Sequence, residues 1–260
     1  MIAKKCFGQN FLKNPHVLTQ IKDALGLEKK DSILEVGPGP SFLTQILLPE
    51  VSQYIAVEID RQFQPILESL HIQYPYFTYL IDDFLVQPAD LFIHCTKFVG
   101  NLPYNISSPI LYKIASETKI ATLVCMFAEG SADRFLASPG SKNYSAGSIL
   151  AQSFFKVEKI MFVSRTQFNP SPKIDSYVLR FTRNNANQDE IIAFNHWVQP
   201  LFSYRRKTIL NALIQTLLSK EKALFLLEKS SISPGERIEN LSIENLQIMF
   251  TNYRNEYNHD

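Results

Sequence analysis

The segment Asn101-Leu102-Pro103-Tyr104 holds the residue types that can bind an aromatic amine. The Asn101 side chain offers a carbonyl oxygen as a hydrogen-bond acceptor. Pro103 leaves the Leu102 carbonyl without a regular backbone partner, because proline interrupts the pairing of strands. Two such acceptors can hold both hydrogens of an amine, while Tyr104 presents a flat face to a base that has left its stack. The alternative is an ordinary loop between a strand and a helix, where asparagine and proline are common.

A glycine-rich turn and an acidic residue precede this segment. In Glu35-Val36-Gly37-Pro38-Gly39, the glycines let the backbone bend sharply and let a ligand approach without a Cβ in the way. Phe42 excludes the Gly-x-Gly-x-x-Gly dinucleotide pattern. Glu58 stands 21 residues beyond Gly37, where a carboxylate can accept hydrogen bonds from both hydroxyls of a ribose. Alone, each is equally an ordinary turn or a solvated acid; together they favour a nucleotide-containing cofactor.

Two later segments combine aromatic and basic side chains. Residues 168–173 (FNPSPK) begin with Phe168 and end with Lys173, and their prolines make a rigid, extended stretch. This stretch either closes the far side of a base pocket or simply connects two elements. Residues 203–207 (SYRRK) are expected to open a helix. Cations at that end oppose the helix dipole, so they favour a contact with phosphate over the alternative of a solvated helix start.

Short apolar runs alternate with helical patterns over the first half of the chain. We expect strands at 32–36, 54–57, 77–81, 97–100 and 121–127, and helices at 16–27, 42–48, 61–70 and 109–116. This alternation is typical of parallel βαβ units and an α/β, doubly wound sheet. The first four strands each end in a polar or glycine-rich cluster, which predicts a ligand crevice at their carboxyl ends.

The second half of the chain changes character. Further strands are expected at 149–163 and 174–182. Residues 183–190 (RNNANQDE) contain no large apolar side chain and indicate a linker. Helical patterns follow at 191–202, 205–218, 220–229 and 243–250. We therefore expect two domains, residues 1–183 and residues 184–260, of which the second is small and helical.

Composition narrows the class of protein. Hydrophobic residues make up 45% of the chain, which allows a sizeable core, and no apolar run approaches the roughly 18 residues of a membrane helix. The three cysteines and five histidines are scattered, which predicts no metal site and fits the cytoplasm. Residues 134–207 hold 11 basic and 4 acidic side chains. This clustering is compatible with nucleic-acid binding, although solvated surfaces would give the same count.

Taken together, these motifs resemble one known family. FGQNFL (7–12), EVGPG (35–39), NLPYNISSP (101–109), FNPSPKIDS (168–176) and RRK (205–207) are similar to the ribosomal RNA small-subunit adenine dimethyltransferases of the KsgA type. The resemblance covers residues 4–250. It implies a Rossmann-like, doubly wound sheet of the class I methyltransferases with a small C-terminal helical domain.

The resemblance also implies roles for individual residues. S-adenosyl-L-methionine is the implied cofactor, bound by Asn10, Leu12, Gly37, Glu58, Asp83 and Asn101. Glu58 would take the ribose and Asp83 the adenine amine of the cofactor, with Asp82 as the alternative. The implied catalytic residues are Asn101, Leu102, Tyr104 and Phe168, with Tyr104 and Phe168 sandwiching the target base. The implied RNA contacts are Lys173, Arg205, Arg206 and Lys207.

The implied reaction is dimethylation of the 6-amino groups of two adjacent adenines near the 3′ end of 16S rRNA, in the immature 30S subunit, by a monomer. The chain departs from the family pattern at Pro40-Ser41-Phe42, at 128–130 and at 145–147. Two alternatives remain open: an Erm-like methyltransferase of large-subunit rRNA, and a non-catalytic ribosome assembly factor of the same fold. FGQNFL and residues 140–144 (GSKNY) favour the small-subunit enzyme over the Erm-like one.

Overall fold

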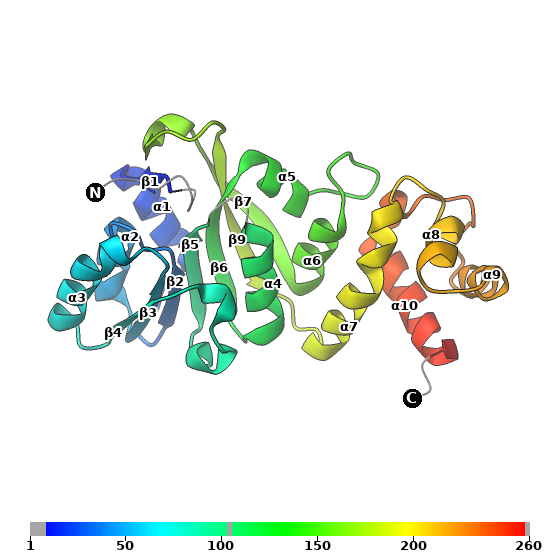
Figure 1. Cartoon of the computed structure of the whole chain (residues 1–260), viewed down its shortest axis with the longest axis horizontal. Helices are drawn as coiled ribbons and strands as arrows, with labels where there is room; N and C mark the ends of the chain where they lie inside the picture. The colour runs from blue at the N-terminus through cyan, green and yellow to red at the C-terminus, as the bar shows by residue number, and fades with distance from the viewer. Residues whose placement is uncertain (1–8, 103–105, 258–260) are drawn as a thin grey trace. The chain divides into compact units, whose positions relative to one another are not determined.

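The computed structural model describes residues 9–102 and 106–257. The chain forms two compact units (Figure 1). The first consists of Met1–Ala132 and Phe155–Arg183, and the second of Asp133–Phe154 and Asn184–Asp260. The second unit thus takes in residues 133–154 in addition to the C-terminal part that the sequence pattern indicates.

A mixed seven-stranded sheet forms the centre of the first unit, in the order β4-β3-β2-β5-β6-β9-β7. Its strands are β2 (Ser32–Val36), β3 (Gln53–Glu58), β4 (Phe77–Ile81), β5 (Lys97–Asn101), β6 (Thr122–Ala128), β7 (Phe155–Val163) and β9 (Ser176–Arg183). Strands β2 to β6 pair in parallel, whereas β9 is antiparallel to both β6 and β7. The predicted α/β doubly wound sheet is confirmed. Because β2 lies between β3 and β5, the strand order reverses there, which is where such sheets bind ligands.

Helices cover both faces of this sheet (Figure 1). They are α1 (Pro15–Leu25), α2 (Phe42–Leu47), α3 (Gln64–Gln73) and α4 (Ser107–Glu117), and α5 (Glu129–Phe135) follows β6. The apolar stripe of α1, with Val17 and Ile21, shares a buried cluster with Val99 of β5. Phe98 alternates with Val99 and points to the opposite face, where the ring of Phe84 links it to α4.

Arg183 holds the end of α4. Its guanidinium donates hydrogen bonds to the carbonyl oxygens of Ile114, Ala115 and Ile120, at 3.1, 3.0 and 2.8 Å. It also lies 4.9 Å from the ring centroid of Phe155. The last carbonyls of a helix lack partners within the helix, so this side chain adds hydrogen bonds where α4 ends and ties the helix to the residues that follow it.

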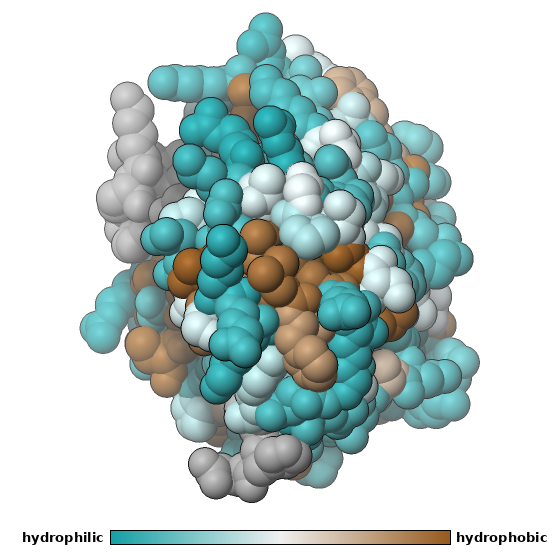
Figure 2. Space-filling model, turned by 90° about the vertical axis from the view of Figure 1, so that its right-hand side faces the viewer, coloured by the Kyte–Doolittle hydropathy of each residue, from teal (hydrophilic) through white to brown (hydrophobic). Residues whose placement is uncertain are grey.

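The second unit is helical, with α6 (Ala146–Phe154), α7 (Gln188–Val198), α8 (Ile209–Thr216), α9 (Lys220–Lys229) and α10 (Ile243–Tyr257). Its buried cluster includes Trp197, Leu213, Leu226 and Met249. Figure 2 looks onto the end where Figure 1 draws α8 and α9, and shows hydrophobic side chains gathered among hydrophilic ones. Amphipathic helices packed on a shared apolar core explain this unit.

Most expected elements form within one or two residues of their predicted ends, whereas the ends of α3, α7, α8 and α10 differ by three or more residues. The prediction of a strand over 149–163 is wrong in its first part, because residues 149–154 belong to helix α6 and only β7 is a strand. A continuous apolar run is compatible with either structure, and length alone did not separate them. Residues 205–207 precede α8 rather than open it, since Thr208 is its N-cap.

Among the described residues, no helix is long and apolar enough to cross a membrane.

Candidate functional site

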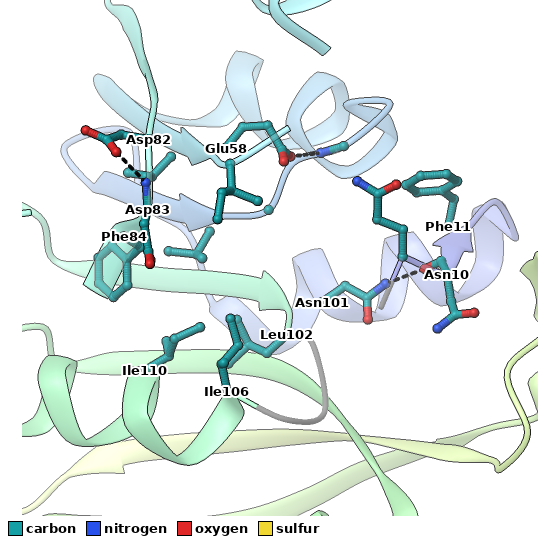
Figure 3. Close-up of a pocket in the computed structure, with 16 residues that line it drawn as sticks. Asn10, Phe11, Glu58, Asp82, Asp83, Phe84, Asn101, Leu102, Ile106 and Ile110 are labelled. Carbon is teal, nitrogen blue, oxygen red and sulfur yellow. Dashed lines mark hydrogen bonds between the residues drawn. The ribbon is translucent and has the colours of Figure 1, made fainter. Parts of the chain in front are cut away.

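A cavity of about 770 Å³ lies at the carboxyl ends of β2, β3, β4 and β5 (Figure 3). Five of the six residues predicted to bind a cofactor line it: Asn10, Gly37, Glu58, Asp83 and Asn101. They come from segments up to 91 residues apart, as the contact between Asn10 and Asn101 shows. The sheet therefore brings the predicted residues together at the edge that its topology indicates.

The glycine turn forms one wall of the cavity. Gly37 has φ +73° and Gly39 has φ +52°, which is the left-handed region that glycine occupies without strain. The Gly37 amide donates to the Val57 carbonyl at 2.9 Å, so the turn is fixed to β3. A Cβ at Gly39 would lie 3.2 Å from the Phe11 ring. Both glycines are thus required by the backbone path, and Gly39 also by the close approach of the N-terminal segment.

Glu58 ends β3, and its side chain is buried at 3% exposure. Its Oε2 accepts a hydrogen bond from the Gly39 amide at 2.9 Å, and its Oε1 accepts one from the Asp60 amide at 2.8 Å. Burial raises the pKa of this carboxyl, and the two backbone hydrogen bonds oppose that rise. A carboxylate has about four acceptor positions, so each oxygen keeps capacity for one hydroxyl of a diol.

Two aspartates follow β4. Asp83 is half-buried, and its Oδ1 accepts from the Leu85 amide at 2.9 Å; Asp82 is exposed and accepts from the Asp83 amide at 2.8 Å. In Figure 3 the Asp82 carboxylate lies on the outer side of the cavity. Asp83 is therefore the better placed of the two to accept from a group inside the cavity.

Asn101 ends β5, and Figure 3 shows its amide facing the N-terminal segment. Its Nδ2 donates to the Asn10 carbonyl oxygen at 2.9 Å. Because a backbone carbonyl only accepts, this contact requires the nitrogen to face Asn10 and leaves Oδ1 as the acceptor on the other side. The acceptor that the sequence predicts is thus held by a residue of the FGQNFL motif.

Gly100 explains how the chain turns after β5. A Cβ there would lie 2.7 Å from Leu102 Cδ2 and 3.1 Å from the Val36 carbonyl oxygen. The absence of a side chain at Gly100 allows Leu102 to fold back over the strand into a site where it is 1% exposed. Tyr104, the predicted stacking residue, lies outside the described residues.

Apolar residues that were not predicted also line the cavity: Ile59, Phe84, Ile106 and Ile110. Ile59 is 46% exposed although it is large and apolar, and it directly follows Glu58. The flat apolar group of a ligand would cover such a side chain. The sequence signal that could have identified Ile59 is its position directly after Glu58, the acid that ends β3.

Leu12 and Phe168 lie on a separate two-stranded sheet. Strand β1 (Phe11–Leu12) pairs with β8 (Phe168–Asn169), and Leu12 stands opposite Phe168. Leu12 lines a neighbouring cavity of about 520 Å³ that shares Phe11, Gly37 and Asn101 with the first. Phe168 is 6% exposed and belongs to the buried cluster of the first unit. Its role against a target base stays a prediction.

Glu35 is a buried carboxyl beneath the glycine turn and lines the smaller cavity. Its Oε2 accepts from the Thr44 hydroxyl at 2.6 Å and from the Tyr54 hydroxyl at 2.8 Å. Burial raises the pKa of Glu35 to about 7, and the two hydrogen bonds only partly oppose this. The group therefore changes charge near neutral pH.

The predicted RNA-binding cations have different surroundings. Lys173, Arg206 and Lys207 are exposed. Arg205 is half-buried; its Nε lies 3.0 Å from Glu239 Oε2, and its Nη2 donates to the Lys142 carbonyl at 2.8 Å. The structure thus engages Arg205 within the second unit and leaves Arg206 and Lys207 at the surface.

Among the described residues, no group of three or more histidines, cysteines or acids is placed to hold a metal ion.

The fold and the site first define a class, the class I methyltransferases. A dimethyladenosine transferase from Plasmodium falciparum is similar, with a TM-score of 0.81 and 27% identity, covering 94% of this chain and 98% of the other. The 23S rRNA methyltransferase ErmE shares the fold, with a TM-score of 0.71, 22% identity, and coverage of 94% and 99%.

The chain belongs to the family described as ribosomal RNA adenine dimethylase, whose family model matches residues 2–255. The ribosomal RNA small subunit methyltransferase A of Lactococcus lactis is 38% identical over 257 residues, covering 93% of this chain and 86% of the relative. The protein of the same name from Onion yellows phytoplasma is 36% identical over 252 residues, covering 94% of each chain. The family expected from the sequence motifs is confirmed.

Proposed function

We propose that this protein dimethylates the 6-amino groups of two adjacent adenines near the 3′ end of 16S rRNA in the immature 30S subunit, using S-adenosyl-L-methionine. One observation carries the proposal: the Asn101 amide nitrogen is engaged by the Asn10 carbonyl, which leaves its carbonyl oxygen as the acceptor in the cavity that Glu58 also lines. The membership in the adenine dimethylase family and the names of its relatives support the substrate.

The cavity fits the nucleoside part of S-adenosyl-L-methionine. Glu58 keeps acceptor capacity for the ribose hydroxyls, Asp83 for the adenine amine, and Ile59 supplies an apolar face for the ring. Gly37 leaves the backbone open to a close approach. Asn10 and Leu12 complete the proposed set from the N-terminal segment. S-adenosyl-L-methionine supplies an electrophilic methyl group on sulfur.

The target amine is a poor nucleophile, because its lone pair is delocalised into the adenine ring. Asn101 Oδ1 and the Leu102 carbonyl would accept its two hydrogens and favour a more pyramidal nitrogen, whose lone pair is then available. Alignment with the methyl group supplies much of the rate through positioning. A strong general base is not needed, since the proton can leave after the nitrogen has become cationic. Two adenines require four transfers, with exchange of the cofactor between them.

Tyr104 and Phe168 are proposed to hold the target base between their rings. Phe168 is buried beside Leu12, so this role requires its ring to become accessible when RNA binds. Lys173, Arg206 and Lys207 are proposed phosphate contacts, with Arg205 beside them.

The proposal is tested with small ribosomal subunits that lack the modification and with labelled S-adenosyl-L-methionine. Mass spectrometry of the nucleosides should find dimethyladenine in the small-subunit RNA. Transfer to large-subunit RNA instead would identify an Erm-like enzyme. Cofactor binding without any methyladenine would identify an assembly factor.

Asn101→Ala tests the amine contact. We expect transfer to fall about 100-fold or more, as when one stabilising group of a transition state is removed. Calorimetry with S-adenosyl-L-methionine reports whether the fold and the cofactor site survive. Gln73→Ala, which removes an exposed carboxamide at the end of α3, is the matched control and should transfer normally. Undiminished activity in Asn101→Ala would rule out the assignment.

A further inference from the structure

Strand β7 brings an exposed surface to the end of the sheet at which the parallel strands finish and the cofactor cavity lies. It is the outermost strand of the sheet, and both β7 and β6 are antiparallel to β9. Strand β7 therefore runs in the direction of β5, and its last residues lie at the edge where Asn101 ends β5. Three strand spacings separate β5 from β7, which is about 15 Å. A stacked strand rises about 3.4 Å per nucleotide, so a few nucleotides bridge this distance.

An aromatic pair stands at this end of β7. Phe162 is 51% exposed, whereas its neighbour Val163 is 1% exposed. Phe162 lies opposite Tyr177 of β9, and the two rings meet edge to face with centroids 5.4 Å apart. The pair is therefore fixed by the register of the two strands, and the ring of Phe162 remains open to solvent.

A lysine accompanies the pair. Lys159 Nζ lies 3.8 Å from the ring centroid of Tyr177. Among the described residues, no carboxylate forms an ion pair with Lys159, because the nearby Glu158 pairs with Lys156 and Arg180. The cation is thus held over an aromatic face with its charge not neutralised by an acid.

Two more exposed residues lie just before β9, the strand that carries Tyr177. Lys173 is exposed, and Ile174 is 45% exposed. An open aromatic ring beside unneutralised cations matches the chemistry of single-stranded nucleic acid, in which bases stack on aromatic side chains and phosphates attract lysines.

We propose that Phe162, Tyr177 and Lys159 bind single-stranded RNA that flanks the target adenine, with one flanking base stacked on Phe162 and a phosphate beside Lys159. This surface rests on the proposed function, since RNA must first present an adenine at Asn101. It would extend the binding site beyond the base pocket.

The test measures the affinity of the purified full-length protein for two synthetic RNAs by fluorescence anisotropy. The longer RNA has two adenines between runs of five uridines, and the shorter has them between single uridines. Phe162→Ala should weaken binding of the longer RNA about 5- to 50-fold, the effect of losing one stacked base, and leave the shorter RNA unaffected. Phe162→Tyr should retain the affinity. Lys159→Gln should reduce the salt slope for the longer RNA by about 0.7.

The controls lie elsewhere on the first unit. Ile72→Ala truncates an apolar side chain that is 74% exposed on α3, near the opposite edge strand β4. Lys30→Gln removes an exposed cation just before β2, at the amino end of the strands. Neither should change RNA affinity. Calorimetry with S-adenosyl-L-methionine verifies that each variant is folded.

Several outcomes would overturn the proposal that this surface binds RNA. Equal affinity of the wild type and Phe162→Ala for the longer RNA would do so, and so would an equal loss for both RNAs. If Phe162→Ala binds naked RNA normally but no longer binds small subunits, the surface contacts a protein instead. Each of these results leaves methyl transfer by the wild type intact, whereas failure of the proposed function shows as no transfer by the wild type itself.

Discussion

Replacing the buried Glu35 by glutamine should remove a large part of the pH dependence of stability. The pKa of this carboxyl rises from its ordinary value of 4.5 to about 7, chiefly through burial. Between these values the folded state binds more protons than the unfolded state, so the free energy of unfolding falls as the pH rises. From pH 5 to pH 8 this one group lowers the free energy of unfolding by about 2 to 3 kcal/mol.

Glutamine suits the test because it keeps a carbonyl oxygen at the position that Thr44 and Tyr54 share. Its amide nitrogen has a cost of its own, since a buried donor without a partner destabilises by about 1–3 kcal/mol. That cost does not vary with pH. The diagnostic quantity is therefore the difference between the unfolding free energies at pH 5 and pH 8, not either value alone.

Urea denaturation followed by circular dichroism at several pH values measures this difference. We expect the wild type to lose about 2 to 3 kcal/mol more than Glu35→Gln over the interval. Glu221→Gln, an exposed acid in the first turn of α9, is the control and should resemble the wild type. Parallel pH profiles for wild type and Glu35→Gln would refute the idea that Glu35 is protonated in the folded protein near neutral pH.

Three further substitutions test other parts of the structure. Ser41 is buried at φ +63° without the freedom of glycine, so Ser41→Gly should raise the free energy of unfolding by about 0.5–1 kcal/mol and the melting temperature accordingly. Arg183→Lys should lower that free energy by about 2–3 kcal/mol, because lysine lacks the planar fork that donates two hydrogen bonds to carbonyls of α4 and one to Ile120, and amide exchange in the last turn of α4 should accelerate. Arg205→Gln should lower the thermal stability of the second unit through loss of the pair with Glu239, while the salt slope of RNA binding stays as in the wild type.

Each of these has a result that would contradict it. A lower melting temperature for Ser41→Gly would show that the Ser41 side chain contributes more than its backbone strain costs. Unchanged amide exchange in the last turn of α4 in Arg183→Lys would show that Arg183 does not stabilise this end of the helix. A salt slope reduced by about 0.7–0.9 in Arg205→Gln, as expected for Arg206→Gln or Lys207→Gln, would identify Arg205 as a phosphate contact itself.

The sequence by itself determined the order of strands and helices, the family, and the strand ends at which the site lies. These follow from local signals. Apolar periodicity predicts an element, and a glycine turn or a strand-end acid such as Glu58 is defined by its neighbours in the chain. The same signals were ambiguous where one apolar run suits two structures, as at residues 149–154, which form a helix.

Only the tertiary structure decided which partner each group has. It assigned the Asn101 amide to a carbonyl 91 residues away, paired Arg205 with Glu239, and placed Phe168 in a buried position beside Leu12. It also joined residues 133–154 to the helical unit and placed β9 antiparallel to β6. Hydrogen bonds and burial between distant segments depend on the packed chain and leave no periodic trace in the residues themselves, so a motif identifies the functional group but not what orients it.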